Sequence, residues 1–316
     1  MSGSAFERNV VRRPLRDPAY PTVAGRQAPP MTYMSSKQAP DAPLYSELSW
    51  IYEKPQPNPY FAEQVLDYDQ ILLHIGMDPD TPQDLGATVQ LYLGGQRIAF
   101  TTTTAILIPK GTPFGPLSWQ EVHRPHLQML IVLGSGDPFA GRERRFLGNE
   151  QVFFPKKMRK FDYEQLVVRN PLREAGPDYV EGRQNPTMTY MSRTQVQLAT
   201  TYLEFSWIWA PPSLNIPRMR HDNYDEVVWH IGSDPADPVD LGATLEFGIG
   251  NETFEFDTTH CCYLPRQLSH GPIKWKTVRR PMIEMALMLG AATWEEGWKN
   301  SFFDAPETEP GARTTE

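Results

Sequence analysis

The chain contains one long internal repeat. Its best-matching segments are GRQAPPMTYMS at 25–35 with GRQNPTMTYMS at 182–192, SW at 49–50 with SW at 206–207, and HIGMDPDTPQDLGATVQ at 74–90 with HIGSDPADPVDLGATLE at 230–246. The separation is 157 positions for SW (50 to 207) and 156 for HIG (74 to 230). A repeat of half the chain indicates a duplicated domain, because solenoid repeats are roughly 20 to 50 residues long. We therefore predict two domains, residues 1–155 and 156–316.

Short apolar runs between prolines indicate β-strands. The chain has 31 prolines, most of which separate runs such as AILIP and QMLIVLG. Residues 88–102 have the alternation of a hairpin with a Gly-Gly turn at 94–95, and residues 244–257 repeat it with a Gly-Asn turn at 250–251. This pattern predicts an all-β fold, in which each half forms an antiparallel jelly-roll barrel.

Composition favours a small molecule as the partner. The net charge is −8 and the pI is about 5.5. No long run of Lys or Arg and no stretch of about 18 apolar residues occurs, so we expect neither a nucleic-acid nor a membrane partner. The only cysteines, Cys261 and Cys262, are adjacent and predict buried thiols in a reducing, cytoplasmic compartment. The proline-rich arm at 14–43 could exchange across a homodimer.

Two motifs in the second half resemble those of the cupin superfamily. His221 precedes Glu226 by a short interval, and PRQLSHGP at 265–272 is similar to the second cupin motif, a Pro-x-Gly-x-x-His turn. Gln267 stands in place of the motif glycine, which fits only if the backbone there does not require positive φ. The YDE, IG-DP and DLGA signature further resembles a set of bacterial bicupins, mostly without assigned activity. The resemblance implies two tandem cupin barrels.

The resemblance also implies a divalent metal in the second barrel alone. Its ligands would be His221, Glu226 and His270, because imidazole nitrogens and a carboxylate suit transition metals. Fe(II) is the metal we favour, with Mn, Ni or Zn as alternatives. In the first half Gln70 and Phe114 replace Glu226 and His270, which predicts a degenerate site.

The first motif leaves the ligand register open. If His221 is the second histidine of the usual pair, the first falls at Met219, a weak ligand for harder metals. A shift by one residue would make Asp222 an oxygen ligand instead. His230 is a third possibility, because it shares strand parity with Glu226. Its counterpart His74 survives in the half without ligands, which favours a core histidine.

Aromatic and sulfur-containing side chains predict an apolar substrate pocket. The residues we assign to it are Trp209, Trp229, Tyr263 and Met285. The candidate catalytic residues are Tyr224 and Glu284, and Glu284 is either a proton-transfer group within an apolar strand or a surface residue.

These features predict a metal-dependent enzyme acting on a small aromatic or oxygen-bearing substrate, with Fe(II) dioxygenase as the leading hypothesis. The alternatives are a non-redox isomerase, lyase or decarboxylase, and a non-catalytic binding protein.

Overall fold

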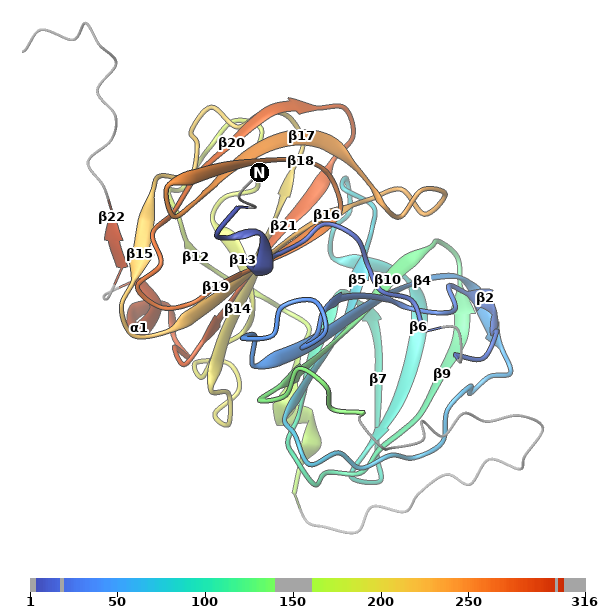
Figure 1. The fold of residues 1–316 in the computed structure, drawn as a ribbon. Coiled ribbons are helices and arrows are strands. Elements are labelled where there is room, and N and C mark those ends of the chain that lie inside the picture. The colour runs from blue at the N-terminus through green and yellow to red at the C-terminus, as the bar shows by residue number, and fades with distance from the viewer. Residues whose placement is uncertain (1–3, 18–19, 140–160, 299–300, 304–316) are drawn as a thin grey trace, which may run out of the picture.

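The structure is a computed structural model that describes residues 4–17, 20–139, 161–298 and 301–303. The predicted boundary between residues 155 and 156 lies outside these residues. Two β-barrels lie side by side (Figure 1). Every β-ladder among the described residues is antiparallel, so the prediction of an all-β, tandem jelly-roll fold is confirmed.

The first barrel consists of a large and a small sheet. The large sheet has the order β11-β8-β5-β10-β4-β2, with β3 paired to β4, and the small sheet has the order β7-β6-β9. The elements of the N-terminal half are η1 (Glu7–Asn9), β1 (Val10–Val11), β2 (Ala24–Arg26), β3 (Met31–Met34), β4 (Leu44–Gln56), β5 (Gln70–Gly76), β6 (Asp84–Leu93), β7 (Gln96–Thr102), β8 (Thr104–Ile108), β9 (Phe114–Val122) and β10 (His126–Leu133).

The second barrel repeats this plan. Its sheets have the orders β1-β19-β16-β21-β14-β13-β12 and β18-β17-β20-β15-β22. The elements of the C-terminal half are η2 (Tyr163–Leu166), β11 (Val167–Val168), β12 (Leu172–Ala175), β13 (Thr187–Met191), β14 (Thr201–Ile208), β15 (Met219–His221), β16 (Asp225–Gly232), β17 (Asp240–Ile249), β18 (Glu252–Thr258), β19 (His260–Leu264), β20 (His270–Val278), β21 (Met282–Leu289), α1 (Trp294–Trp298) and β22 (Ser301–Phe303).

The two halves exchange their first strands. β1 pairs with β19 of the second barrel, so Val10 lies opposite Cys262, and β11 pairs with β8 of the first barrel, so Val167 lies opposite Ile106. Figure 1 shows the N-terminal segment in blue running beside the orange and red barrel. Each barrel is therefore completed by a strand from the other repeat.

Alternation along the strands divides the second large sheet into two faces. On β16, Val227, Trp229 and Ile231 belong to the hydrophobic core that continues into the first barrel. The indole of Trp229 donates to Ser46 Oγ of the first barrel at 3.2 Å. Glu226 and His230 have the opposite parity and face the interior of their own barrel.

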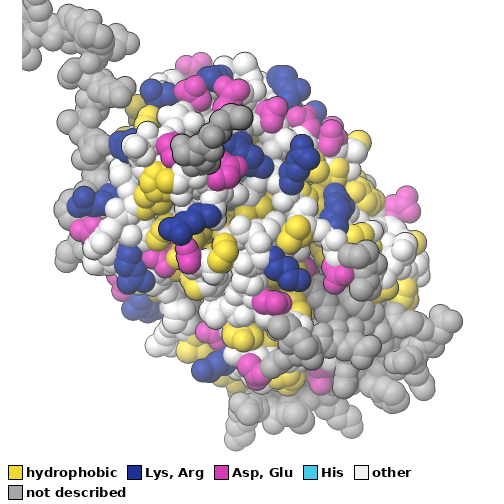
Figure 2. Space-filling model, in the orientation of Figure 1, with side chains coloured by type: hydrophobic (Ala, Val, Ile, Leu, Met, Phe, Trp, Pro, Cys, Tyr) yellow, Lys and Arg dark blue, Asp and Glu magenta, His cyan; other side chains and the backbone are white. Residues whose placement is uncertain are grey.

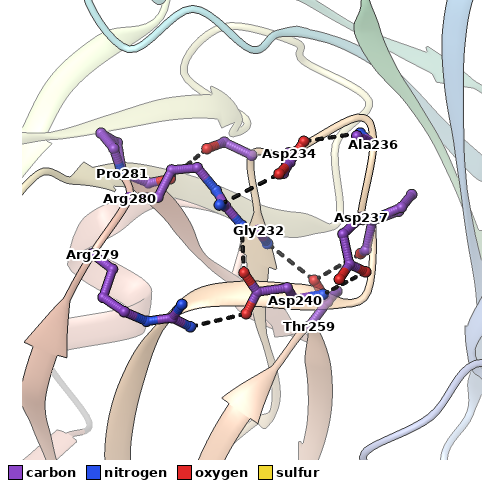
Figure 3. Close-up of polar contacts among 11 residues, drawn as sticks. Gly232, Asp234, Ala236, Asp237, Asp240, Thr259, Arg279, Arg280 and Pro281 are labelled. Atoms are coloured by element: carbon purple, nitrogen blue, oxygen red, sulfur yellow. Dashed lines mark hydrogen bonds and ion pairs between the residues drawn. The ribbon is translucent and has the colours of Figure 1, made fainter.

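The IG-DP and DLGA signature supports the hairpin that follows β16 (Figure 3). Asp240 accepts from Arg279 at 3.0 Å and also binds Arg280, and the Gly232 N–H donates to Thr259 Oγ1 at 3.0 Å. The first barrel repeats these contacts, with Arg124 on Asp84 at 2.6 Å. Because both barrels keep them, we assign the signature a structural role. Gly232 and Glu226 are at opposite ends of β16, about 20 Å apart at the usual strand rise.

Charged side chains of both signs are intermingled on the face of the molecule drawn in Figure 2. Within the described ranges, no helix combines the length and hydrophobicity that crossing a bilayer requires.

Candidate metal centre

Three side chains from three strands converge at one end of the second barrel. His221 ends β15, Glu226 lies at the start of β16, and His270 begins β20. Antiparallel pairing of β15 with β20 places Met219 opposite His270 and so brings the strands together. The Nε2 atoms of His221 and His270 lie 3.3 and 3.0 Å from Glu226 Oε2. All three side chains are buried, with 3 to 6% of their surface exposed.

The other nitrogen of each imidazole is held by the protein. His270 Nδ1 donates to the Leu268 carbonyl at 3.0 Å. His221 Nδ1 lies 2.8 Å from both Ser301 Oγ and Tyr224 Oη, and Ser301 itself donates to the Gly297 carbonyl, so its oxygen can accept from the imidazole. These partners favour the Nδ1–H tautomer and leave the Nε2 lone pairs directed at the centre.

The two Nε2 atoms fit metal ligation. Both are buried and make no well-directed hydrogen bond to any described residue, although buried polar atoms are generally paired. His221, Glu226 and His270 are the one group among the described residues whose ligand atoms lie close enough to hold an ion, within 4.8 Å of one another. Two imidazoles and one carboxylate are a recurring ligand set for divalent transition metals.

Met219 occupies the position of the missing histidine. It shares strand parity with His221, lies opposite His270 and lines the same cavity. The alternative register, with Asp222 as an oxygen ligand, does not fit the structure, because the Asp222 carboxylate binds Arg220 at 3.1 Å on the outside of the barrel. His230 lies farther along the barrel interior, where its Nδ1 contacts His260 Nε2 at 3.0 Å, and it is not part of the group of three.

The turn before His270 carries backbone strain. Gln267 has φ of 68°, matching Gly111 at 74° in the first barrel. The expectation that the backbone at Gln267 does not require positive φ is therefore wrong. The turn keeps this conformation because the Gln267 N–H donates to the His221 carbonyl at 2.6 Å, which ties the turn to the ligand strand. A non-glycine residue in this conformation costs roughly 1–2 kcal/mol.

A cavity of about 260 Å³ opens beside the three side chains. Its polar lining includes Arg183, Glu204 and Glu284, and most of the remaining wall is apolar. Arg183 contacts Glu284 Oε2 at 3.0 Å, while its Nε has no partner among the described residues. Glu204 accepts from Thr187 at 2.7 Å. Of these three residues, only Glu284 was predicted. Arg183 and Glu204 were not singled out, because the first repeat has the same residue types at the matching positions Arg26 and Glu47, which is typical of residues that stabilise the fold.

The surroundings shift the pKa values of the lining acids in different directions. It raises the pKa of Glu204 to about 7, and it raises the pKa of Glu284 against the opposing effect of Arg183. Burial would also raise the pKa of Glu226, but in the metal-free chain hydrogen bonds and positive charge from protonated His221 and His270 outweigh it and hold that pKa below its ordinary value.

The charges of the lining favour a cation. Three carboxylates and one guanidinium would sum to −2 if all were ionised, and a buried charge of this size needs protons or a cation to balance it. A divalent ion supplies this charge, so the residues fit a metal.

The predicted aromatic pocket is not the lining of this cavity. Trp229, Tyr263 and Met285 have the other strand parity and pack in the core between the barrels. Trp209 is 40% exposed and donates to the Pro79 carbonyl at 3.3 Å. Tyr224 holds His221, and burial raises its pKa.

The first barrel lacks the ligands at equivalent positions. The Gly111 N–H donates to the Leu66 carbonyl as Gln267 does to His221, so Leu66 is the counterpart of His221. Gln70 replaces Glu226, and Phe114 replaces His270.

Comparison with solved structures shows the class of fold. The oxalate decarboxylase of Lactobacillus farciminis in a formate complex superposes with a TM-score of 0.54 at 11% identity over 87% of this chain and 83% of that chain. The Bacillus subtilis enzyme at pH 4.6 gives 0.54 at 10% identity over 90% and 79%. A third oxalate decarboxylase structure gives 0.57 at 10% identity over 96% and 80%.

The chain therefore has a bicupin fold, in agreement with the fold that the resemblance of its two motifs predicted. No protein-family model and no curated protein matches the sequence.

Proposed function

We propose that the second barrel is a metal-dependent, non-redox lyase centre that decarboxylates a small carboxylic acid. The observation that carries this proposal is the placement of Arg183 and two buried acids around one cavity with His221, Glu226 and His270. The fold of the oxalate decarboxylases supports it, and one matching structure describes Mn(II) centres in the B. subtilis enzyme. These relatives favour a decarboxylase with Mn(II) over our initial Fe(II) dioxygenase.

His221, Glu226 and His270 would hold the metal. When bound, it supplies positive charge that fixes and polarises an oxygen-bearing substrate. The Nε–H of Arg183 binds a substrate carboxylate through a charge-assisted hydrogen bond. The apolar wall excludes water from that carboxylate. This destabilises the negative charge of the carboxylate and favours its release as neutral CO2.

Glu204 is the proton donor in this proposal. Cleavage of the bond between carbon and carboxylate leaves an electron pair on the carbon, and one proton completes the product in place of CO2. With a pKa of about 7, Glu204 keeps its proton in a large fraction of molecules at neutral pH. Thr187 and Tyr202 orient its carboxyl group at 2.7 and 3.1 Å.

The test combines metal analysis with two product measurements. Chelated protein is reloaded with Mn(II) or Fe(II) and mixed with oxalate, malonate and hydroxybenzoates, while CO2 release and O2 consumption are followed. CO2 release without O2 consumption, abolished by chelator, is the expected result. A protein that takes up no metal and releases no CO2 would refute the proposal.

An Fe(II) dioxygenase is the second candidate. The observation in its favour is the set of two histidines and one carboxylate, which is typical of non-haem Fe(II) oxygenases when other positions are open. Stoichiometric O2 consumption with Fe(II) in the same experiment would support it.

A further inference from the structure

We infer that the first barrel contains a second binding site, one that takes a short-chain monocarboxylate, such as formate or acetate, without a metal. It lies in a cavity of about 60 Å³. A buried water needs roughly 10–15 Å³, so this cavity accommodates a few waters or one ligand of about three to five heavy atoms. The inference does not depend on the proposed function of the second barrel.

Three buried polar atoms, each on a residue that lines this cavity, have no hydrogen-bond partner among the described residues. They are Arg26 Nε, Ser49 Oγ and Gln70 Oε1. These residues are between 1 and 7% exposed, so bulk water does not satisfy them. Buried polar atoms are nearly always hydrogen-bonded, and three unpaired atoms on residues that line one cavity indicate a polar occupant.

The donors suit a carboxylate. Arg26 is held over the ring of Tyr60, 4.7 Å from its centroid, and its Nη1 donates to Tyr20 Oη at 2.9 Å. This leaves the Nε–H for a ligand. The Ser49 hydroxyl is a second donor, and the Gln70 amide becomes a third when its oxygen and nitrogen are exchanged.

Comparison with the second barrel excludes a cation. Arg26, Glu47 and Ser49 correspond to Arg183, Glu204 and Ser206, but two acids of the second cavity are Gln70 and Gln128 here. Among the described residues, the charged side chains of this lining are Arg26 and Glu47, whose charges cancel. A neutral cavity without imidazole has no basis for holding a divalent ion, whereas the guanidinium is retained.

The apolar wall limits the size of the ligand. Phe114 fills the position of His270, and Leu66 that of His221, so the space that a metal and a larger substrate would need is occupied. The site therefore selects one carboxylate with a short apolar tail.

The test uses the full chain with the second site disabled by three changes, His221→Ala, His270→Ala and Arg183→Met, because Arg183 is the group proposed to bind a carboxylate there. Titration calorimetry with formate, acetate and propionate, after chelation, is expected to show one site with a Kd of about 1 mM or lower. Arg26→Met should weaken binding at least about tenfold and Ser49→Ala about two- to tenfold, the usual effects of losing a charged and a neutral hydrogen bond. Glu255→Gln, a change on the exposed face of the other barrel, should leave the Kd unchanged.

Ser49→Ala keeps the test decisive if Arg26→Met does not fold, because it removes only one buried hydroxyl. Absence of binding to the disabled chain would mean that the cavity holds water alone and would overturn the inference. Binding that is insensitive to Arg26→Met and Ser49→Ala would also overturn it. Both results can be distinguished from failure of the proposed function, since neither measures catalysis or metal binding.

Discussion

Replacing Glu226 by Gln, the residue at the equivalent position of the first barrel, tests the metal centre directly. This change keeps the shape of the side chain but removes one negative charge from the cavity lining. A unit charge about 4 Å from another contributes on the order of 4 kcal/mol at an effective dielectric constant near 20, per charge on the ion. Loss of even this amount raises the Kd for the metal roughly a thousandfold.

The measurement is the melting temperature of the chelated protein with and without Mn(II). At a metal concentration of about 100 times the Kd, binding stabilises the wild-type protein by about 2.7 kcal/mol. For a domain of about 150 residues this raises the melting temperature by about 5–10 °C. At the same concentration the Glu226→Gln variant is below its Kd, so its shift should be under about 1 °C.

Glu255→Gln is the matched control. Glu255 lies on β18 of the same barrel with 60% of its side chain exposed, and it binds Lys276 at 2.6 Å. This variant should keep the full metal-induced shift. A shift that survives in Glu226→Gln, or that is lost equally in Glu255→Gln, would refute the assignment of Glu226 as a ligand.

Three further predictions concern stability. Gln267→Gly should raise the free energy of unfolding by about 0.5–1 kcal/mol, because relief of the positive-φ strain exceeds the entropic cost of glycine; urea denaturation measures this, and a loss of stability would contradict it. Glu204 has a pKa raised from 4.5 to about 7, so the folded protein binds the extra proton and loses up to about 3 kcal/mol as pH rises through this window; in chelated protein Glu204→Gln should remove that loss, so that its advantage over wild type is larger at pH 8 than at pH 5. Deletion of residues 1–13 removes Val10 and Val11, both under 10% exposed, and should cost about 3 kcal/mol in the second barrel, seen as a lower melting temperature; an unchanged value would contradict the strand exchange.

The architecture was predictable from the sequence because duplication and strand alternation are local patterns. The two copies align through their turns and strands, and the hairpin at β6 and β7 has its two-residue turn at Gly94 and Gly95, both with positive φ. The exchange of β1 and β11 was not predictable. Two valines form each of these strands, and so short an apolar segment does not specify which sheet it joins.

The convergence of His221, Glu226 and His270 was suggested by the resemblance to cupins, and the geometry of the barrel brings them together. The pocket prediction missed because composition does not reveal strand parity. Trp229 and Glu226 are three residues apart on β16, so their side chains point to opposite faces. A large aromatic side chain near a ligand therefore indicated a pocket, although it lies in the core between the barrels.

The repeat itself explains why Arg183 and Glu204 were not predicted as site residues. Both have counterparts in the first barrel, Arg26 and Glu47, and residues common to two copies are most simply assigned to the framework. The structure shows that they line a cavity in each barrel. Both barrels thus keep an arginine and an acid in the cavity lining, while four other lining positions differ, so that of the two linings only the second contains imidazoles. Under the two proposals, the first barrel binds a carboxylate without a metal, so the two barrels allow carboxylate binding to be measured apart from metal binding.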